Sequence, residues 1–390
     1  AEGNAGILNI VLKKVKNDYF GGSVSPSFGL LADRPRYNLS TNFNYKKDKV
    51  TASLQLGAGH GGFLGYFNSY RTYPKQGTYS ASETSFTGKN SYLNVRAGLD
   101  YAFTPELTLG LNLSYTPEKD RPVRQNDTRD YRIAPNGSLE LLRSLPGTAD
   151  ELEKGSYTSA NVHLEKSFKG TPKRRLSWDL DFAGYRQEEG RNFASRGFTP
   201  QGALIPGSDF RFNGTTNQHT DSYITSLDYT EPLGKGTLSF GAKGTWTRTR
   251  NTNDYDALST IGERHDKILF DEHVYALYAD LNQPLSAKWS LRSGLRMEYT
   301  HTAGENNGRR LENLRSYLNI FPTLFIGYNP NERHAFSLDA TVRLNRPHFS
   351  QLSPFPNYEN QYSILIGKED LRASKRAHLA LGYTFLGVLN

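Results

Sequence analysis

The chain has 390 residues, of which 36% are hydrophobic and 12% aromatic, and its formal net charge is +8. With 24 tyrosines and 21 phenylalanines it is too aromatic for a disordered chain, and the absence of cysteine excludes disulfide bonds and thiolate metal sites. Lysine and arginine are scattered among acidic neighbours and form no long basic cluster, so nucleic acid is not expected as a partner.

The chain begins with a short apolar strand that follows a turn of small residues. Gly3, Ala5 and Gly6 precede an apolar run over residues 7–12, and lysines follow that run. This pattern is typical of a buried strand entered through a tight glycine turn. We expect it to be the last strand of a larger element.

Beyond residue 17 the strongest pattern is an alternation of apolar and polar residues with period two. It is clear in ELTLGLNLSY (106–115), KWSLRSGLRMEY (288–299) and HAFSLDATVRLN (334–345). Such alternation predicts strands with one apolar and one polar face. About fourteen strands of this kind, many of about 10–14 residues, are predicted between residues 19 and 386, which is long enough to cross a hydrocarbon layer.

Short polar connections alternate with long segments along the chain. The short connections are at 46–49, 103–106, 169–174, 231–236, 283–288 and 329–333. The long segments are near 60–90, 117–155, 187–219, 250–270, 301–315 and 346–372. In a meander, all short turns then lie at one end, as in an outer-membrane barrel with tight periplasmic turns and long external loops.

The polar face of these strands carries more charge than the interior of a β-sandwich tolerates, but it suits the lumen of a wide barrel. We therefore predict an all-β, antiparallel transmembrane β-barrel in the bacterial outer membrane, with outer-membrane lipid as a partner. The alternative fold is a soluble array of β-sandwiches.

AEGNAGILNIVLKK, through Gly3, Ala5, Gly6 and Asn9 among other positions, resembles the end of the plug domain of TonB-dependent outer-membrane receptors, in particular of the barrel family common in Bacteroidetes. NRPHFSQLSPFPNYENQYSILIGKEDLRAS resembles a second stretch of the family, in which a strand ending in Arg-Pro leads through Leu-x-Pro to a glycine turn. The matching positions there are Arg346, Pro347, Leu352, Pro354, Gly367 and Leu371.

The resemblance implies a plug domain followed by a barrel of about 22 strands. Residues 1–16 would be the end of the plug, and residues 17–390 the N-terminal two-thirds of the barrel, about 14 strands. The chain is thus expected to be a monomeric fragment. The implied function is TonB-dependent active uptake of a scarce or bulky ligand (siderophore, glycan or peptide), with the TonB energy-coupling complex contacting the region before residue 1. The alternative is a passive or structural barrel such as a porin, adhesin or assembly scaffold.

The candidate ligand-binding residues lie in two aromatic-rich segments that are predicted to be external loops. They are Tyr66, Phe67, Tyr70, Arg71 and Tyr73 in the first, and Phe349, Phe355, Tyr358 and Tyr362 in the second. Aromatic rings supply a large contact area at low entropic cost and can stack on sugars, siderophores or peptides. The alternative is that these rings pack against one another to fold the loops.

No residue pattern predicts catalysis, a metal site or a cofactor. The nine histidines are dispersed and lack the spacing of known metal motifs. His163 is expected to line the lumen, and Asp179 and Asp181 to be lumen charges that pair with Arg or Lys on a neighbouring strand. A barrel lipase or protease would require a Ser, His and acid set, and none can be assembled, so the protein is predicted not to be an enzyme.

Overall fold

The computed structural model describes residues 18–256, 260–311, 316–360 and 363–385. The predicted plug-end residues Gly3, Ala5, Gly6 and Asn9 therefore lie outside the described residues, as does Tyr362. Within the described part, no helix is long and apolar enough to cross a membrane.

One antiparallel sheet contains most of the described chain, and its strands follow one another in chain order. They are β1 (Tyr19–Leu31), β2 (Arg34–Lys47), β3 (Val50–Tyr73), β4 (Thr78–Thr104), β5 (Leu107–Ile133), β6 (Leu139–Phe168), β7 (Thr171–Ser195), β8 (Phe210–Leu233), β9 (Gly236–Tyr255), β10 (Arg264–Pro284), β11 (Trp289–Asn306), β13 (Tyr317–Asn331), β14 (His334–Asn345) and β17 (Ser374–Phe385). A two-residue strand, β12 (Arg309–Arg310), pairs with β11. The prediction of an all-β antiparallel meander is confirmed.

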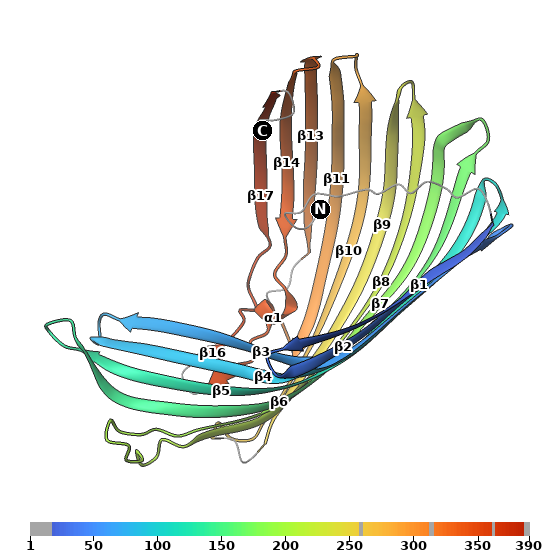
Figure 1. The fold of residues 1–390 in the computed structure, drawn as a ribbon. Helices are drawn as coiled ribbons and strands as arrows, with labels where there is room; N and C mark the ends of the chain where they lie inside the picture. The colour runs from blue at the N-terminus through green and yellow to red at the C-terminus, as the bar shows by residue number, and fades with distance from the viewer. Residues whose placement is uncertain (1–17, 257–259, 312–315, 361–362, 386–390) are drawn as a thin grey trace.

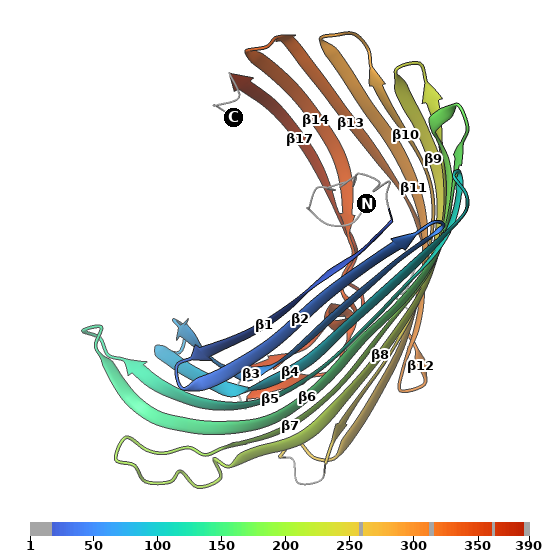
Figure 2. The same cartoon turned by 45° about the vertical axis from the view of Figure 1, so that its right-hand side comes forward.

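The sheet is strongly curved and open, as Figures 1 and 2 show. β1 and β17 are its two ends, and no ladder between described residues joins them. The connection from β14 to β17, residues 346–373, contains the short helix α1 (Phe349–Leu352) and the hairpin β15 (Asn357–Asn360)–β16 (Ser363–Leu365). This connection, which we call the inner segment, lies on the concave side of the sheet (Figure 2).

The strand registers separate an apolar face from a polar one across the sheet. Leu99 lies opposite Leu111, which lies opposite Val162, so leucines and valine from β4, β5 and β6 form one band. One residue further along, Asn112 lies opposite Asn161. The ring of Phe270, on the same face as these asparagines, packs against Phe349 of the inner segment, with ring centroids 6.3 Å apart. The polar face is therefore the concave, inner face, and the apolar band is on the convex, outer face.

Beyond the apolar band, the strands continue where the sequence predicted loops. Segments 60–90, 117–155 and 187–219, which we call the extension, are mostly strand, and the connection from β3 to β4 is only residues 74–77. The prediction of long loops is wrong for 60–90 and 117–155, whereas in 187–219 a loop of residues 196–209 does join β7 to β8. The physical reason is that the ladder hydrogen bonds persist past the band, whereas both faces there are largely polar, so hydrophobic alternation no longer marks the strands.

A substitution pair tests the assignment of the two faces. Leu111→Arg places a charge in the apolar band, whereas Asn112→Arg places the same charge on the inner face of the same strand. We expect Leu111→Arg to lower the free energy of unfolding in phospholipid vesicles by about 2–4 kcal/mol, because lipid-facing arginine is costly near the bilayer centre. We expect Asn112→Arg to have a much smaller effect. Equal losses in urea-unfolding measurements would contradict the assignment.

Candidate functional site

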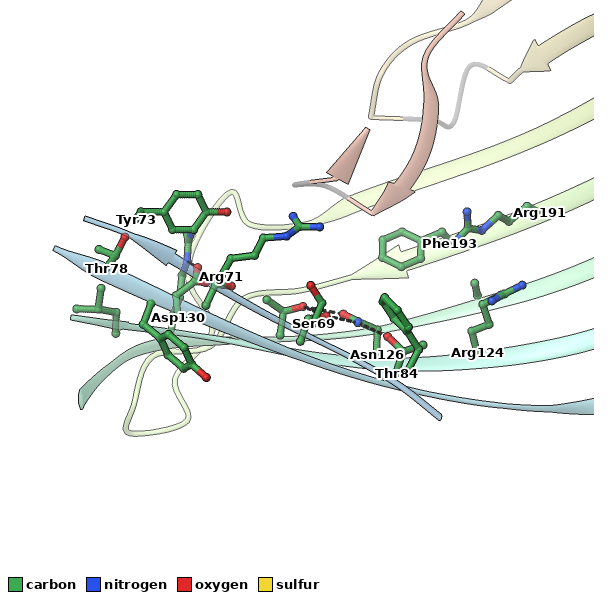
Figure 3. A pocket seen from close by; sticks show the side chains of 18 of the residues that line it. Ser69, Arg71, Tyr73, Thr78, Thr84, Arg124, Asn126, Asp130, Arg191 and Phe193 are labelled. Carbon is green, nitrogen blue, oxygen red and sulfur yellow. Dashed lines mark hydrogen bonds and ion pairs between the residues drawn. The ribbon is translucent and has the colours of Figure 1, made fainter. Parts of the chain in front are cut away.

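The extension carries a cavity of about 820 Å³ on its inner face, lined by residues of β3 to β7 (Figure 3). We call this cavity the basin. Alternation along each strand brings its lining together: Arg71 lies opposite Ser80, and Ser80 lies opposite Asp130 on the next strand. The basin thus continues the inner face beyond the apolar band.

The structure divides the first group of predicted site residues between the two faces of β3. Phe67, Arg71 and Tyr73 line the basin. Tyr66 and Tyr70 alternate with them and point to the other face, where they are 75% and 58% exposed. Tyr66 lines a separate cavity of about 900 Å³ on that outer face.

A hydrogen-bonded set of small polar side chains forms part of the basin wall. The Nδ2 of Asn126 donates to Ser82 Oγ at 2.7 Å and to Thr84 Oγ1 at 2.8 Å. The hydroxyl of Thr128 donates to Ser82 Oγ at 3.0 Å or to Asn126 Oδ1 at 2.9 Å. These bonds join β4 to β5 through side chains as well as through the backbone, and they fix the direction of each group.

Glu151 is the buried charge at one end of the basin, and its side chain is only 2% exposed. Arg124 Nε lies 2.7 Å from its Oε2, and Arg191 Nε lies 2.8 Å from its Oε1. Each carboxylate oxygen is therefore paired with a separate guanidinium. A charge this deeply buried requires such partners, because its desolvation alone costs several kcal/mol.

Arg191 also holds the inner segment. Its Nη1 donates to the carbonyl oxygen of Tyr358 at 2.9 Å, and its guanidinium lies 5.4 Å from the ring centroid of Phe212. The ring of Tyr358 packs against Phe212 and Tyr255, with centroids 6.2 and 5.9 Å away. The hydroxyl of Tyr255 donates to the Pro356 carbonyl at 3.1 Å, and burial raises the pKa of Tyr255 to about 12.

A second arginine anchors the start of the inner segment. Arg346 Nη2 lies 2.8 Å from Glu298 Oε2 and donates to Thr300 Oγ1 at 3.0 Å. Arg296 pairs with the same carboxylate. Arg346 is one of the positions that match the second receptor motif, so this part of the motif corresponds to a contact between the segment and the wall.

The aromatic residues predicted in the second segment pack within the protein. Phe355 is 5% exposed and belongs to a buried cluster with Ile268 and Leu311, against which Phe349 also packs. Tyr358 contacts the wall as described above. This packing gives these rings a structural role, and their contact with a ligand stays a prediction.

Gly367 lies where the inner segment doubles back on itself. Its N–H donates to the Ser353 carbonyl at 2.8 Å, and the following N–H, of Lys368, donates to the Gln351 carbonyl at 2.7 Å. A Cβ on Gly367 would lie closer than 3.0 Å to both carbonyl oxygens. Glycine is needed here because two backbones approach each other closely.

Two more carboxylates lie beside Glu151 on the inner face. Burial raises the pKa of Glu189, and the charge of Glu151 raises it further. Burial also raises the pKa of Glu153, which lies opposite Glu189 in the β6–β7 ladder. Glu189, which lines the basin, and Glu153 beside it therefore hold protons more readily than exposed carboxylates do.

The wall within the apolar band carries the polar residues expected for a lumen. His163 lies on the inner face, where its Nε2 is 3.3 Å from Asp100 Oδ1. Asp179 and Asp181 both accept from Asn161 Nδ2, at 3.3 and 2.8 Å, and neither forms an ion pair with a described Arg or Lys. Within the described part of the chain, no three His, Asp or Glu side chains are grouped to hold a metal ion.

Sequence reasoning missed most of the basin because it assigned segments 60–90, 117–155 and 187–219 to loops. Glu151, Arg124 and Arg191 were not candidates, nor were the hydroxyl and amide groups of β4 and β5. A usable signal exists: Ser80, Ser82 and Thr84 recur with period two, as do Arg124, Asn126, Thr128 and Asp130. A search for alternating polar types, instead of alternating hydrophobicity, would have detected both strands.

Replacing Gly367 tests whether its close backbone approach holds the inner segment in place. We expect Gly367→Ala to displace the turn, because the added methyl group meets two carbonyl oxygens, and to speed tryptic cleavage after Lys368 severalfold. Gly190→Ala is the matched control, since no atom lies within 4 Å of a Cβ added there. Equal cleavage rates in the two variants would show that the segment does not depend on this contact.

The carboxyl of Glu189 predicts a pH dependence of stability. Its pKa is raised in the folded state, so its contribution to stability falls as the pH rises above about 4.5, the ordinary value. We expect Glu189→Gln to raise the midpoint of urea unfolding at about pH 7.5. We also expect it to reduce the difference between the midpoints measured at about pH 7.5 and about pH 5. Glu188→Gln is the control, because Glu188 is half exposed and lies on the outer face beside Lys154. A larger effect of the control variant would refute this account.

The chain is similar to three solved structures at a low level. The Pseudomonas putida toluene transporter TodX is 12% identical, with 85% of this chain and 83% of that chain covered and a TM-score of 0.33. The Escherichia coli outer membrane protease OmpT is 10% identical, with coverage of 72% and 96% and a TM-score of 0.26. A mutant of the Pseudomonas aeruginosa ferric enterobactin receptor PfeA is 8% identical, with coverage of 93% and 79% and a TM-score of 0.20.

No curated protein matches the sequence. Residues 166–390, more than half of the chain, match the family described as "Outer membrane protein beta-barrel family". The matched region begins near the end of β6 and includes β7 to β17, with the inner segment and its two arginine anchors. Together with the antiparallel meander and its apolar outer band, this match shows that the chain belongs to the outer membrane protein beta-barrel family.

Proposed function

We propose that the protein is an outer-membrane receptor that takes up a scarce or bulky ligand by TonB-dependent active transport. The observation that carries this proposal is the position of the basin, which lies on the inner face beyond the apolar band. A ligand held there is outside the hydrocarbon layer and faces the passage that the polar wall borders. The proposal includes no bond-making or bond-breaking step.

The position of the inner segment favours an energy-coupled receptor rather than an open pore. It lies on the concave side and is attached to the wall through Arg191 and Arg346. A segment inside the curved sheet reduces the free cross-section, which serves a gated receptor better than a diffusion channel. We propose further that residues 1–16 are the end of a plug domain and that residues 17–390 are the N-terminal two-thirds of the barrel, as the motif resemblance implies.

Conductance distinguishes coupled uptake from passive diffusion. The full gene product, purified from outer membranes, is inserted into planar lipid bilayers in potassium chloride, beside a general porin purified in the same way. We expect the protein to show no steady open channel, because the passage of a coupled receptor is closed until energy is supplied. Stepwise, lasting conductance like that of the porin would contradict active uptake and favour a passive barrel.

A further inference from the structure

We propose that the basin binds an extended, oxygen-rich ligand with anionic groups, of the chemical class of acidic oligosaccharides, and that Arg71 pairs with an anionic group of that ligand. This inference rests on the proposed function, because it names the ligand class for the same basin. It is carried by the charges, the hydrogen-bond donors and the backbone arrangement of the walls.

Arg71 differs from the other arginines of the basin. Arg124 and Arg191 are held by Glu151, and Arg143 Nε lies 2.8 Å from Asp130 Oδ2. Arg71 makes no ion pair or hydrogen bond with any described residue, although it lines the same cavity. Figure 3 shows its side chain between Tyr73 and Ser69. Its guanidinium is therefore available to a carboxylate, sulfate or phosphate group, for which its planar donor geometry is suited.

The wall beside Arg71 offers hydrogen-bond donors. The Nδ2 of Asn126 donates to Ser82 Oγ and to Thr84 Oγ1, and Thr128 Oγ1 lies 3.0 Å from Ser82 Oγ. A hydroxyl that accepts through its lone pairs still has its own hydrogen to donate. The hydroxyls of this wall therefore favour a ligand that is rich in acceptor oxygens.

The lining charge also favours an anion. The basin is lined by four arginines and three carboxylates, so its formal charge is +1 when all of them are ionised. One of the carboxylates is Glu189, whose raised pKa lets it hold a proton more readily. The formal charge of the lining is therefore positive, and it rises further when Glu189 is protonated.

The geometry of the walls favours a glycan over a peptide bound as an added strand. In that mode of recognition, an extended peptide pairs with a free sheet edge. The basin is built from the faces of β3 to β7, whose backbone groups are bonded to neighbouring strands. Phe67 and Tyr73, which are 64% and 40% exposed, instead present rings, which suit the faces of sugars.

Calorimetric titration of the full gene product in detergent tests the ligand class. The probes are an oligogalacturonate, which carries carboxylates, a chondroitin sulfate oligosaccharide, which also carries sulfates, and neutral maltohexaose. We expect at least one acidic probe to bind, more weakly as salt is raised, and maltohexaose not to bind. Failure of both acidic probes to bind, or equal binding of maltohexaose, would overturn the inference.

Substitution at Arg71 tests the assigned residue. We expect Arg71→Gln to weaken binding of the acidic probe by about tenfold or more, since a charge-assisted contact is lost, and Arg71→Lys to weaken it less. Arg121→Gln is the matched control, because Arg121 is an exposed arginine whose position on β5 places it on the outer face. A heat-shifted gel band verifies folding of each variant. Unchanged affinity in folded Arg71→Gln would refute the role of Arg71.

The two proposals fail separately. Lasting conductance together with Arg71-dependent binding of an acidic probe would overturn active uptake and leave the ligand class standing. A closed protein that binds neither acidic probe would overturn the ligand class and leave active uptake standing.

Discussion

Every backbone N–H and C=O group that crosses a hydrocarbon layer must find its hydrogen-bond partner within the protein. In this chain the ladders of one meander meet that demand, and the rest of the structure depends on them. The strict alternation that a ladder imposes puts Leu99, Leu111 and Val162 on the outer face and the polar residues on the inner one. The same ladders continue past the apolar band, so they also align the residues that line the basin.

Ion pairs on the inner face stabilise two buried carboxylates and position the inner segment. Glu151 and Glu298 are both almost completely buried, and each is paired with two arginines. Because an unpaired buried carboxylate would cost several kcal/mol, both sites require their arginines in place. One arginine of each site contacts the inner segment or belongs to it, namely Arg191 and Arg346. The arginines that stabilise the buried carboxylates thus also position the inner segment against the wall.

The sequence was sufficient to predict the membrane-crossing part of the fold. Alternating runs such as ELTLGLNLSY predicted its strands, because one face is uniformly apolar only where lipid contacts it. The same criterion failed in the extension, where both faces of β3 to β8 are largely polar and the strand signal disappears. The short motif around Arg346 and Gly367 was recognisable, but its physical reasons, an ion pair with Glu298 and a close backbone approach, required the three-dimensional arrangement.

The candidate site was predictable only in part, for a related reason. Phe67, Arg71 and Tyr73 were identified as ligand-binding candidates by residue type, and alternation along β3 brings all three to the basin. Tyr66 and Tyr70 were identified with equal weight, because a segment read as a loop has no faces. Phe355 is nearly buried, since an aromatic-rich segment inside a concave sheet can form a small core of its own.

The continuity of the strands from the apolar band into the extension has a consequence for capture of a ligand. A binding surface made of free loops must lose conformational entropy when it closes on its ligand, and that loss weakens association. Here β3 to β7 carry their hydrogen-bonded pairing from the bilayer into the surrounding water, so the contact groups are ordered before any ligand arrives. Under the proposed uptake of a scarce ligand, such advance ordering favours tight retention at low concentration.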